Sequence, residues 1–238
     1  MLRISLLTNC DTSDWSVGKE ILDAFSGDLR LVPETLFQWE TKIAEYESVS
    51  GCKPYWAQVA KIQAQGTKIE IPIGLRWKRK KVAKYECEVS HTHTSIKGEL
   101  ISGSVNVRAQ FNSKVDWFEL FSKLCIATRP KYAMLHIFSG SELEGIKAGT
   151  PESLFLSGVL QSGKISNASW SMFLGTEFLV GLDIDVLRGN GFFVDELDSG
   201  CIIRITDDIQ DVINDFSSFS KCRADLKSVF QDGFFLMD

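Results

Sequence analysis

Alternation of apolar and polar residues is clearest in the middle of the chain, where a period of two is maintained along three successive runs. The runs are residues 69–77, 83–90 and 101–111. This period is typical of a strand with one buried and one solvent-facing side. Short polar segments join the runs, so the pattern predicts an antiparallel meander over 69–111. Pro72 and Gly74 place the first run at a sheet edge or a bulge, because proline cannot donate a ladder hydrogen bond.

Helical spacing and capping residues predict the remaining elements. A strand is expected at 1–8, and a helix near 14–26 is capped by Ser13 or Asp14 and ends at Gly27. The other expected elements are a helix at 54–65, a helix at 117–128 with Asp116 as its cap and Pro130 after it, a buried strand at 132–138, a strand at 168–174, a helix at 176–188, a hairpin turning at 198–200 and a helical segment at 211–230.

These elements predict an α+β fold with a largely antiparallel sheet and helices packed on one side. Two related α+β halves are expected in one compact unit. The N-terminal half covers 1–138 and contains the meander, and the C-terminal half covers 168–238. Residues 139–167 are rich in Gly and Ser and are expected to form an irregular connection. Because sheet edges can join the halves, we expect a single domain.

Composition narrows the class of protein. Of the 238 residues, 44% are hydrophobic and 24% are charged, which is typical of a globular chain and excludes a disordered or collagen-like one. No window reaches 18 uncharged apolar residues, and the first residues lack the apolar stretch of a signal peptide. The six cysteines are spread singly, without a C-x-x-C pair. This usage suits reduced thiols, so we expect a cytoplasmic protein without a membrane partner.

Charge is distributed unevenly along the chain. The formal net charge of −5 argues against general nucleic-acid binding. Residues 53–97 contain ten Lys or Arg against three Glu, a local charge of +7, and much of this excess is the run 78–81 at an expected hairpin tip. Residues 177–238 contain thirteen Asp or Glu against five Lys or Arg, a local charge of −8. These acids either form an ordinary solvated surface or a face that attracts a basic partner.

Catalytic motifs are weak. The sequence has no G-x-S-x-G elbow and no glycine-rich phosphate loop, so we expect no enzyme activity and no cofactor. Cys87, His91 and His93 share one face of an expected strand, and two imidazoles so spaced can converge on one ion. A zinc site needs three or four ligands, however, and no second Cys/His pair is visible. We therefore expect no metal, while a metal-dependent enzyme built on these residues stays open as an alternative.

A nucleic-acid-binding module is a further alternative. The basic stretch from Arg76 to Lys84 is followed by Tyr85 and contains Trp77, so aromatic and basic residues alternate there. The aromatic residues have the parity of the buried face, however, which leaves them unsuited to base stacking.

Several short motifs resemble those of bacterial toxin-immunity proteins. Residues 167–175 (NASWSMFLG) resemble a W-x-x-(F/Y)-(L/F)-G segment, and a hairpin over 192–208 ends in a G-(hydrophobic)-(I/L)-x-(I/L)-T-D run. Residues 128–136 resemble an aromatic-x-x-L-H strand that follows a helix, and residues 31–34 resemble an L-x-P-E segment. In order and spacing, these motifs are similar to the immunity protein 52 family and related type VI secretion immunity proteins.

The resemblance implies a protein that binds a cognate toxin and blocks it, without chemistry of its own. The usual partners of such proteins include nuclease toxins of the restriction-endonuclease fold, which act in the cytoplasm. A nuclease cleft is basic because it holds a phosphate backbone, and an acidic surface can fill it and exclude the substrate. We therefore expect the acidic C-terminal residues to contact the toxin. The candidate residues are Asp195, Glu196, Asp198, Asp207, Asp208 and Asp211.

Overall fold

The computed structural model describes residues 1–64, 67–144, 146–147 and 164–237. The chain divides into two compact units, one formed by Met1–Leu6 with Lys131–Asp238 and the other by Leu7–Pro130. Each unit combines antiparallel strands with helices, so the α+β class is confirmed. The expectation that the chain acts as a single domain stays a prediction.

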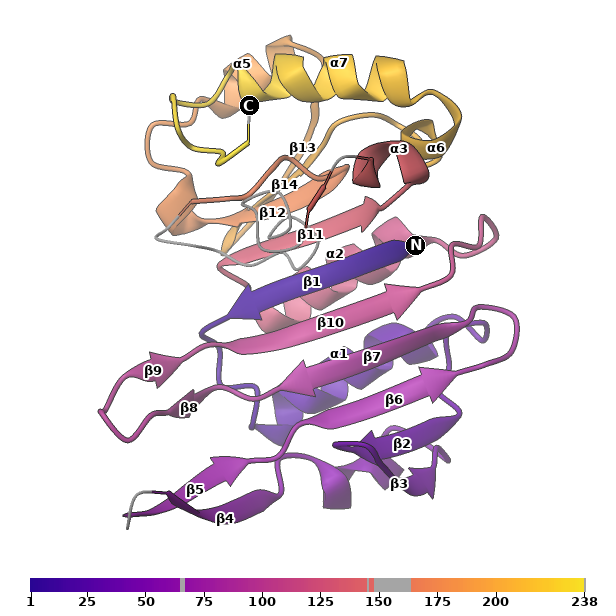
Figure 1. Ribbon diagram of the computed structural model, residues 1–238, viewed down its shortest axis with the longest axis vertical. Coiled ribbons are helices and arrows are strands. Elements are labelled where there is room, and N and C mark those ends of the chain that lie inside the picture. The colour runs from indigo at the N-terminus through magenta and orange to yellow at the C-terminus, as the bar shows by residue number, and fades with distance from the viewer. Residues whose placement is uncertain (65–66, 145, 148–163, 238) are drawn as a thin grey trace. The chain divides into compact units, whose positions relative to one another are not determined.

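The sheet of the Leu7–Pro130 unit has the strand order β10-β7-β6-β2-β3, and each neighbouring pair is antiparallel (Figure 1). Its strands are β2 (Thr35–Gln38), β3 (Thr41–Glu45), β6 (Leu75–Arg79), β7 (Tyr85–Ser90) and β10 (Gly103–Ala109). The strands β6, β7 and β10 follow one another through antiparallel pairings, which confirms the predicted meander.

Strand register explains the core of this unit. Trp77 lies opposite Cys87, which lies opposite Val107, and all three are almost completely buried. These are the positions that the period of two assigns to the buried side. Helix α1 (Trp15–Ser26) covers them, since the ring of Phe25 lies 5.2 Å from that of Trp77. The expected packing of helix on sheet is therefore present here.

Capping residues fix the helix boundaries as predicted. The Asp14 carboxylate accepts a hydrogen bond from the Ser16 amide at the start of α1. Asp116 accepts from the Glu119 amide at 2.8 Å and begins helix α2 (Trp117–Thr128). This helix ends at Arg129, whose φ of 42° is left-handed, directly before Pro130. Both acids satisfy amides that have no partner within the helix.

The predicted helix at 54–65 is wrong. The 3-10 helix η1 (Ser50–Tyr55) is followed by strand β4 (Val59–Ala64), which pairs with β5 (Thr67–Pro72) as a separate antiparallel ribbon. The first predicted run is therefore split, since 67–72 belongs to this ribbon and only the residues from Leu75 enter the main sheet. Gly74 lies at the break, where a Cβ atom would overlap the carbonyl oxygen of Val89. A second short ribbon, β8 (His93–Thr94) with β9 (Leu100–Ile101), separates β7 from β10.

In the unit that contains Lys131–Asp238, the strand order is β13-β14-β12-β11-β1 (Figure 1). The strands are β1 (Leu2–Thr8), β11 (Tyr132–Ile137), β12 (Ser171–Gly175), β13 (Phe193–Leu197) and β14 (Gly200–Arg204). Every residue of β11 and β12 is buried, as expected of central strands covered on both sides. The predicted strands at 1–8 and 132–138 and the β13–β14 hairpin are confirmed, and the strand expected at 168–174 begins at Ser171.

Helices of this unit are shorter than predicted. They are α3 (Gly140–Leu143), the 3-10 helix η2 (Thr176–Phe178), α5 (Ile184–Gly189), α6 (Asp211–Asn214) and α7 (Phe216–Lys227). The expected continuous helix at 176–188 is wrong, because η2 ends at Phe178 and Gly181 in the following turn adopts a φ of 82°, outside the helical range. The segment 211–230 breaks at Asp215, whose carboxylate caps α7 by accepting from the Ser218 amide at 3.1 Å. Most of the connection predicted at 139–167 lies outside the described residues.

No helix within the described ranges is long and apolar enough to span a lipid bilayer. The cysteines there are all free thiols, and Cys52, Cys87, Cys125 and Cys201 are buried.

Candidate functional site

The β13–β14 hairpin carries half of the acidic residues selected from the sequence. Asp195 and Glu196 are exposed neighbours on β13, so their side chains leave opposite faces of the strand. Asp198 is exposed in the two-residue turn between the paired Leu197 and Gly200. These three carboxylates therefore lie close along the chain but point in different directions.

The other three acidic residues follow β14, and local structure uses two of them. The Asp207 carboxylate forms an ion pair with Arg204 at 3.0 Å while its own side chain is fully exposed. Asp208 accepts a hydrogen bond from the Gln210 amide at 2.8 Å and so shapes the turn before α6, whose cap position is Gln210. Asp211 is the first residue of α6 and is half-buried. Neither Asp207 nor Asp208 therefore occupies the cap position of α6.

Strand pairing separates these two groups. Leu197 pairs with Gly200 at the turn, and Phe193 pairs with Arg204 at the opposite end of the hairpin. Four steps along β14 correspond to roughly 13 Å at the usual rise of a strand. Asp198 therefore lies at one end of the hairpin, and Asp207 and Asp208 follow the other end. The candidate surface therefore consists of two acidic patches and not of a single cluster. One patch is Asp195, Glu196 and Asp198, and the other is Asp207, Asp208 and Asp211.

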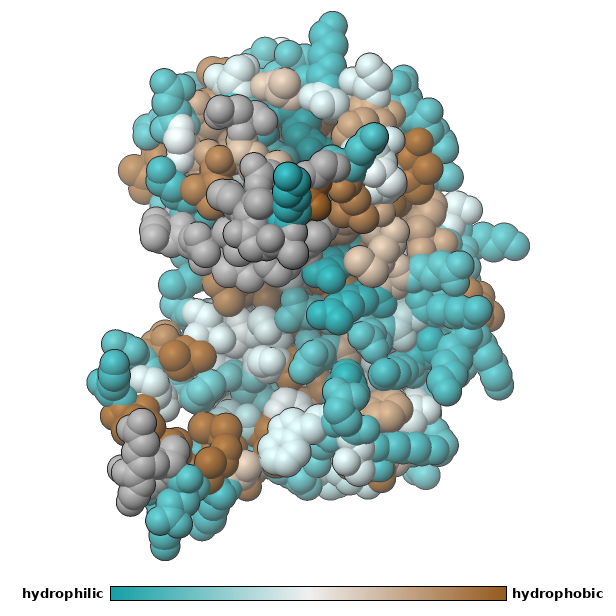
Figure 2. Space-filling model, viewed as in Figure 1, coloured by the Kyte–Doolittle hydropathy of each residue, from teal (hydrophilic) through white to brown (hydrophobic). Residues whose placement is uncertain are grey.

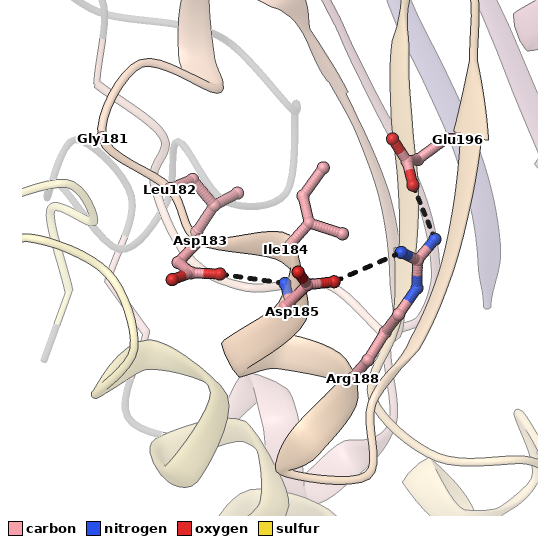
Figure 3. A pocket seen from close by; sticks show the side chains of 7 residues that line it. All are labelled: Gly181, Leu182, Asp183, Ile184, Asp185, Arg188 and Glu196. Carbon is pink, nitrogen blue, oxygen red and sulfur yellow. Dashed lines mark hydrogen bonds and ion pairs between the residues drawn. The ribbon is translucent and has the colours of Figure 1, made fainter.

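A shallow, open pocket adds residues that the sequence analysis did not select as partner contacts (Figure 3). Glu196 points into it and binds Arg188 of α5, with Oε1 2.7 Å from Nη2. Asp185 lies on the other side of the same guanidinium, with 3.8 Å between Oδ1 and Nη1. Asp183 caps α5 through its Oδ1, which accepts from the amide of Asp185 at 3.0 Å.

The pocket is thus an acidic surface organised around one cation. Its carboxylates outnumber the guanidinium of Arg188, and they are strongly exposed at Asp185 and Glu196. Carboxylate oxygens accept hydrogen bonds from Lys and Arg, so the pocket can receive a basic side chain of a partner. One sequence signal points toward this pocket. Asp183 stands directly before an apolar residue, and this pattern indicates the start of a helix. The proximity of this helix to Glu196 depends on the fold and was not visible in the sequence.

The residues of the alternative metal site do not form one. Cys87 is buried in the meander core, and burial raises the pKa of its thiol far above the ordinary value. His91 is also buried, with Nδ1 2.9 Å from the carbonyl oxygen of Thr12, and His93 Nδ1 lies 3.0 Å from the carbonyl oxygen of His91. Among the residues that the structure describes, no group of three or more His, Cys, Asp or Glu side chains could hold a metal ion.

A buried cluster of ionisable residues supports the unit that carries the acidic patches. Arg223 of α7 donates to both carboxylate oxygens of Glu142 on α3, each at 2.8 Å. His136 of β11 lies beside them, with Nε2 3.6 Å from Glu142 Oε1. Burial would raise the pKa of Glu142, but hydrogen bonds and charge from His136 and Arg223 outweigh it and lower that pKa to about 2. Burial lowers the pKa of His136, against the opposing effect of Glu142.

Comparison with known proteins gives a likeness of fold. No family model matches the sequence, and no curated protein matches it either. Among solved structures, the chain is similar to the Pseudomonas aeruginosa T6SS protein PA0821, with a TM-score of 0.57 and 14% sequence identity. The similarity covers 86% of this chain and 64% of that one, so the chain spans less than two thirds of its neighbour's length. At this identity the similarity shows a shared fold.

Proposed function

We propose that this chain is an immunity protein that binds and neutralises a cognate bacterial toxin. The toxin is a nuclease effector, delivered by type VI secretion or belonging to a polymorphic toxin system, and the two proteins meet in the cytoplasm. The fold shared with a protein named for the T6SS supports this proposal. The resemblance of residues 167–175 and 192–208 to immunity-protein motifs supports it independently.

The exposed acidic patches carry the mechanism. A nuclease cleft concentrates positive charge to hold phosphates, and carboxylates on a partner can occupy the same groups. Asp195 and Asp198 suit this role, because no hydrogen bond or ion pair within the described structure engages their carboxylates, and both are exposed. Glu196 and Asp185 add charge around Arg188. The neutralising step is then occlusion, in which no covalent bond forms or breaks.

Electrostatic attraction should appear first in the rate of association. Opposite charge on two partners steers their encounter, and salt screens that attraction. We expect the double variant Asp195→Asn with Asp198→Asn to associate about tenfold more slowly with the toxin at low salt, with a weaker salt dependence. The asparagines keep the size of the side chains, so the fold is retained. The matched control changes Glu20 and Glu47 to Gln, since both are exposed acids in the other unit.

We expect the gene of the toxin to lie beside the gene of this chain. The experiment uses that toxin in purified form, as an inactivated variant for binding assays and as the active enzyme for inhibition assays. We expect the chain to inhibit the nuclease activity of the toxin at an equimolar ratio. We expect only substitutions in the acidic patches to lower the association rate. An association rate that is independent of salt would contradict the electrostatic account. Substrate turnover by the isolated chain, lost on changing one histidine or cysteine, would contradict the proposed function itself.

A further inference from the structure

One end of the sheet in the Leu7–Pro130 unit gathers hairpins that project from it. Pairing places Phe37 opposite Arg76, Leu75 opposite Val89, and Ser90 opposite Ser104. The β2–β3 turn, the β4–β5 ribbon and the β8–β9 ribbon therefore all leave the sheet at this same end. Figure 1 shows both ribbons projecting on one side.

Large apolar side chains are exposed on these hairpins, and Figure 2 shows them as hydrophobic areas over the two ribbons. We call this surface the apolar end. Its exposed residues are Trp39 (67%), Val59 (56%), Ile62 (40%), Ile96 (60%), Leu100 (55%) and Ile101 (39%). Singly exposed apolar residues need no explanation, but a gathering of this kind marks an interaction surface.

The β4–β5 ribbon has two unlike faces. Alternation along the paired strands puts Ile62, Ile69 and Ile71 on one face, and Lys61 with Glu70 on the other. Lys61 and Glu70 form an exposed ion pair at 3.1 Å. A two-stranded ribbon is marginally stable alone, and an isoleucine face is what a partner would cover.

Trp39 occupies a costly backbone conformation at the tip of the β2–β3 hairpin. Its φ is 50°, in a two-residue turn where Gly or Asn is favoured. Gln38 ties this turn to the start of the β4–β5 ribbon, because its Nε2 donates to the Tyr55 carbonyl oxygen at 3.1 Å and to Gln58 Oε1 at 3.2 Å. Strained residues concentrate at functional positions, and tryptophan is enriched among residues that dominate binding energy.

Positive and negative charges on these hairpins are balanced, and this balance limits the classes of partner that the surface can bind. Residues 39–40, 59–72 and 93–101 contain three Lys and three Glu. A phosphate backbone or an anionic membrane would gain nothing from such a surface, since both are bound through excess positive charge. The occupant that fits is a protein surface that is apolar and weakly charged.

We propose that the apolar end is a second contact surface for the cognate toxin, covering an apolar part of the toxin outside its basic cleft. This inference rests on the proposed function. The two surfaces then control different steps of binding. The acidic patches speed association through charge, while burial of Trp39 and the isoleucine face slows dissociation and is insensitive to salt.

Substitutions at the apolar end separate these steps. The test variant combines Trp39→Asn with Ile62→Thr. Asparagine tolerates positive φ, and threonine keeps the β-branched shape that suits a strand, so both substitutions preserve the fold. The control is Val82→Asn, since Val82 has a φ of 61° and is 62% exposed, but lies in the turn between Arg79 and Tyr85 at the opposite end of the strands.

The measurement is surface-immobilised binding kinetics with the inactivated toxin encoded beside this chain's gene. We expect the test variant to dissociate about tenfold faster or more, with its association rate and salt dependence unchanged. The Val82→Asn control should behave as the wild-type chain does.

Other outcomes are distinguishable. If the wild-type chain binds and the test variant dissociates at the same rate, the apolar end is not a toxin contact while the proposed function stands. If the wild-type chain does not bind, both proposals are overturned. Two further results would overturn the inference if toxin binding is unchanged. Loss of self-association of the test variant in sedimentation would assign the surface to a second copy of the chain. Loss of its binding to vesicles of neutral and anionic phospholipid would assign the surface to a membrane.

Discussion

Arg223 and Glu142 form a two-pronged ion pair in the interior of the unit that carries the acidic patches. Both hydrogen bonds measure 2.8 Å, and the side chains are 9% and 3% exposed. The pair joins α7 to α3, and its two residues are 81 positions apart in the sequence. Interior ion pairs of this kind are costly to break, because either partner alone remains as a charge away from water.

Replacing Arg223 should therefore destabilise the protein strongly. We expect Arg223→Met to lower the free energy of unfolding by about 3–5 kcal/mol, since it leaves the Glu142 carboxylate without its cation. Adding Glu142→Gln should recover part of this loss. Urea unfolding followed by tryptophan fluorescence measures both effects. Arg188→Met, which breaks an exposed pair with Glu196, is the control and should cost no more than about 1 kcal/mol.

Stability should fall as the solution becomes more acidic than neutral. Burial lowers the pKa of His136, so below the ordinary value of 6.5 the unfolded chain binds a proton that the folded chain does not. The free energy of unfolding then decreases from about pH 7 downward. Glu142 adds a further loss only between its ordinary value of 4.5 and its lowered pKa of about 2, where the unfolded chain takes up the proton first.

A His136→Asn variant tests the histidine contribution between pH 7.5 and 5. The asparagine amide oxygen can accept the hydrogen bond that the Trp170 amide now donates to Nδ1 at 3.1 Å. The pH dependence of unfolding should be shallower in the variant, although not flat, because burial also lowers the pKa of His91. An equally steep dependence in both proteins would show that His136 does not contribute.

Thiol reactivity should divide the cysteines into two classes. Burial raises the pKa of Cys52 and of Cys201 to about 12 and raises that of Cys87 well above its ordinary value, so these thiols are both protonated and inaccessible. We expect iodoacetamide to label Cys10 and Cys222, which are half-buried, in the folded protein, and the others only on unfolding. Peptide mass spectrometry reads this out. Fast labelling of Cys87 would revive the metal-site alternative, because it would show a reactive thiolate, which is the form of cysteine that binds a metal.

Gly18 and Gly189 should respond oppositely to alanine. A Cβ atom at Gly18 of α1 would overlap the indole of Trp56, which is buried and held by a 3.0 Å hydrogen bond to the Thr12 carbonyl oxygen. Overpacking of this kind costs about 1–3 kcal/mol and outweighs the helix propensity gained. Nothing described lies within 4 Å of a Cβ at Gly189 of α5, so Gly189→Ala should be neutral or stabilising by up to about 1 kcal/mol. Thermal unfolding of both variants compares them directly.

Local patterns predicted much of the fold. The alternation through Trp77, Cys87 and Val107 identified the meander, because side-chain parity is set within each strand. Asp14 and Asp116 identified helix starts, because a cap is a contact between residues a few positions apart. The error at 54–65 has a different origin. Val59 and Ile62 have helical spacing, but Ile62 pairs with Ile69 in a strand, and the side chains of Val59 and Ile62 are exposed. A short sequence window encodes neither the strand pairing nor the exposure.

The location of three candidate acids on a hairpin could be predicted from the sequence, but the arrangement of the candidate surface could not. Asp195, Glu196 and Asp198 are exposed on a hairpin that the sequence located. Their separation from Asp207 follows from strand register, and the partnership of Glu196 with Arg188 follows from the packing of α5 beside β13. The exposure of Trp39 could not be anticipated either, since an apolar residue beside a turn is more often buried than exposed.

The discontinuity of one compact unit has a consequence for biosynthesis. Residues 1–6 belong with residues 131–238, whereas residues 7–130 form the other unit without interruption. A ribosome releases the chain from its N-terminus, so the uninterrupted unit is complete while its neighbour still lacks most of its length. We therefore expect 7–130 to acquire its structure first during translation. The first six residues leave the ribosome earliest, but they are among the last to join their folded unit.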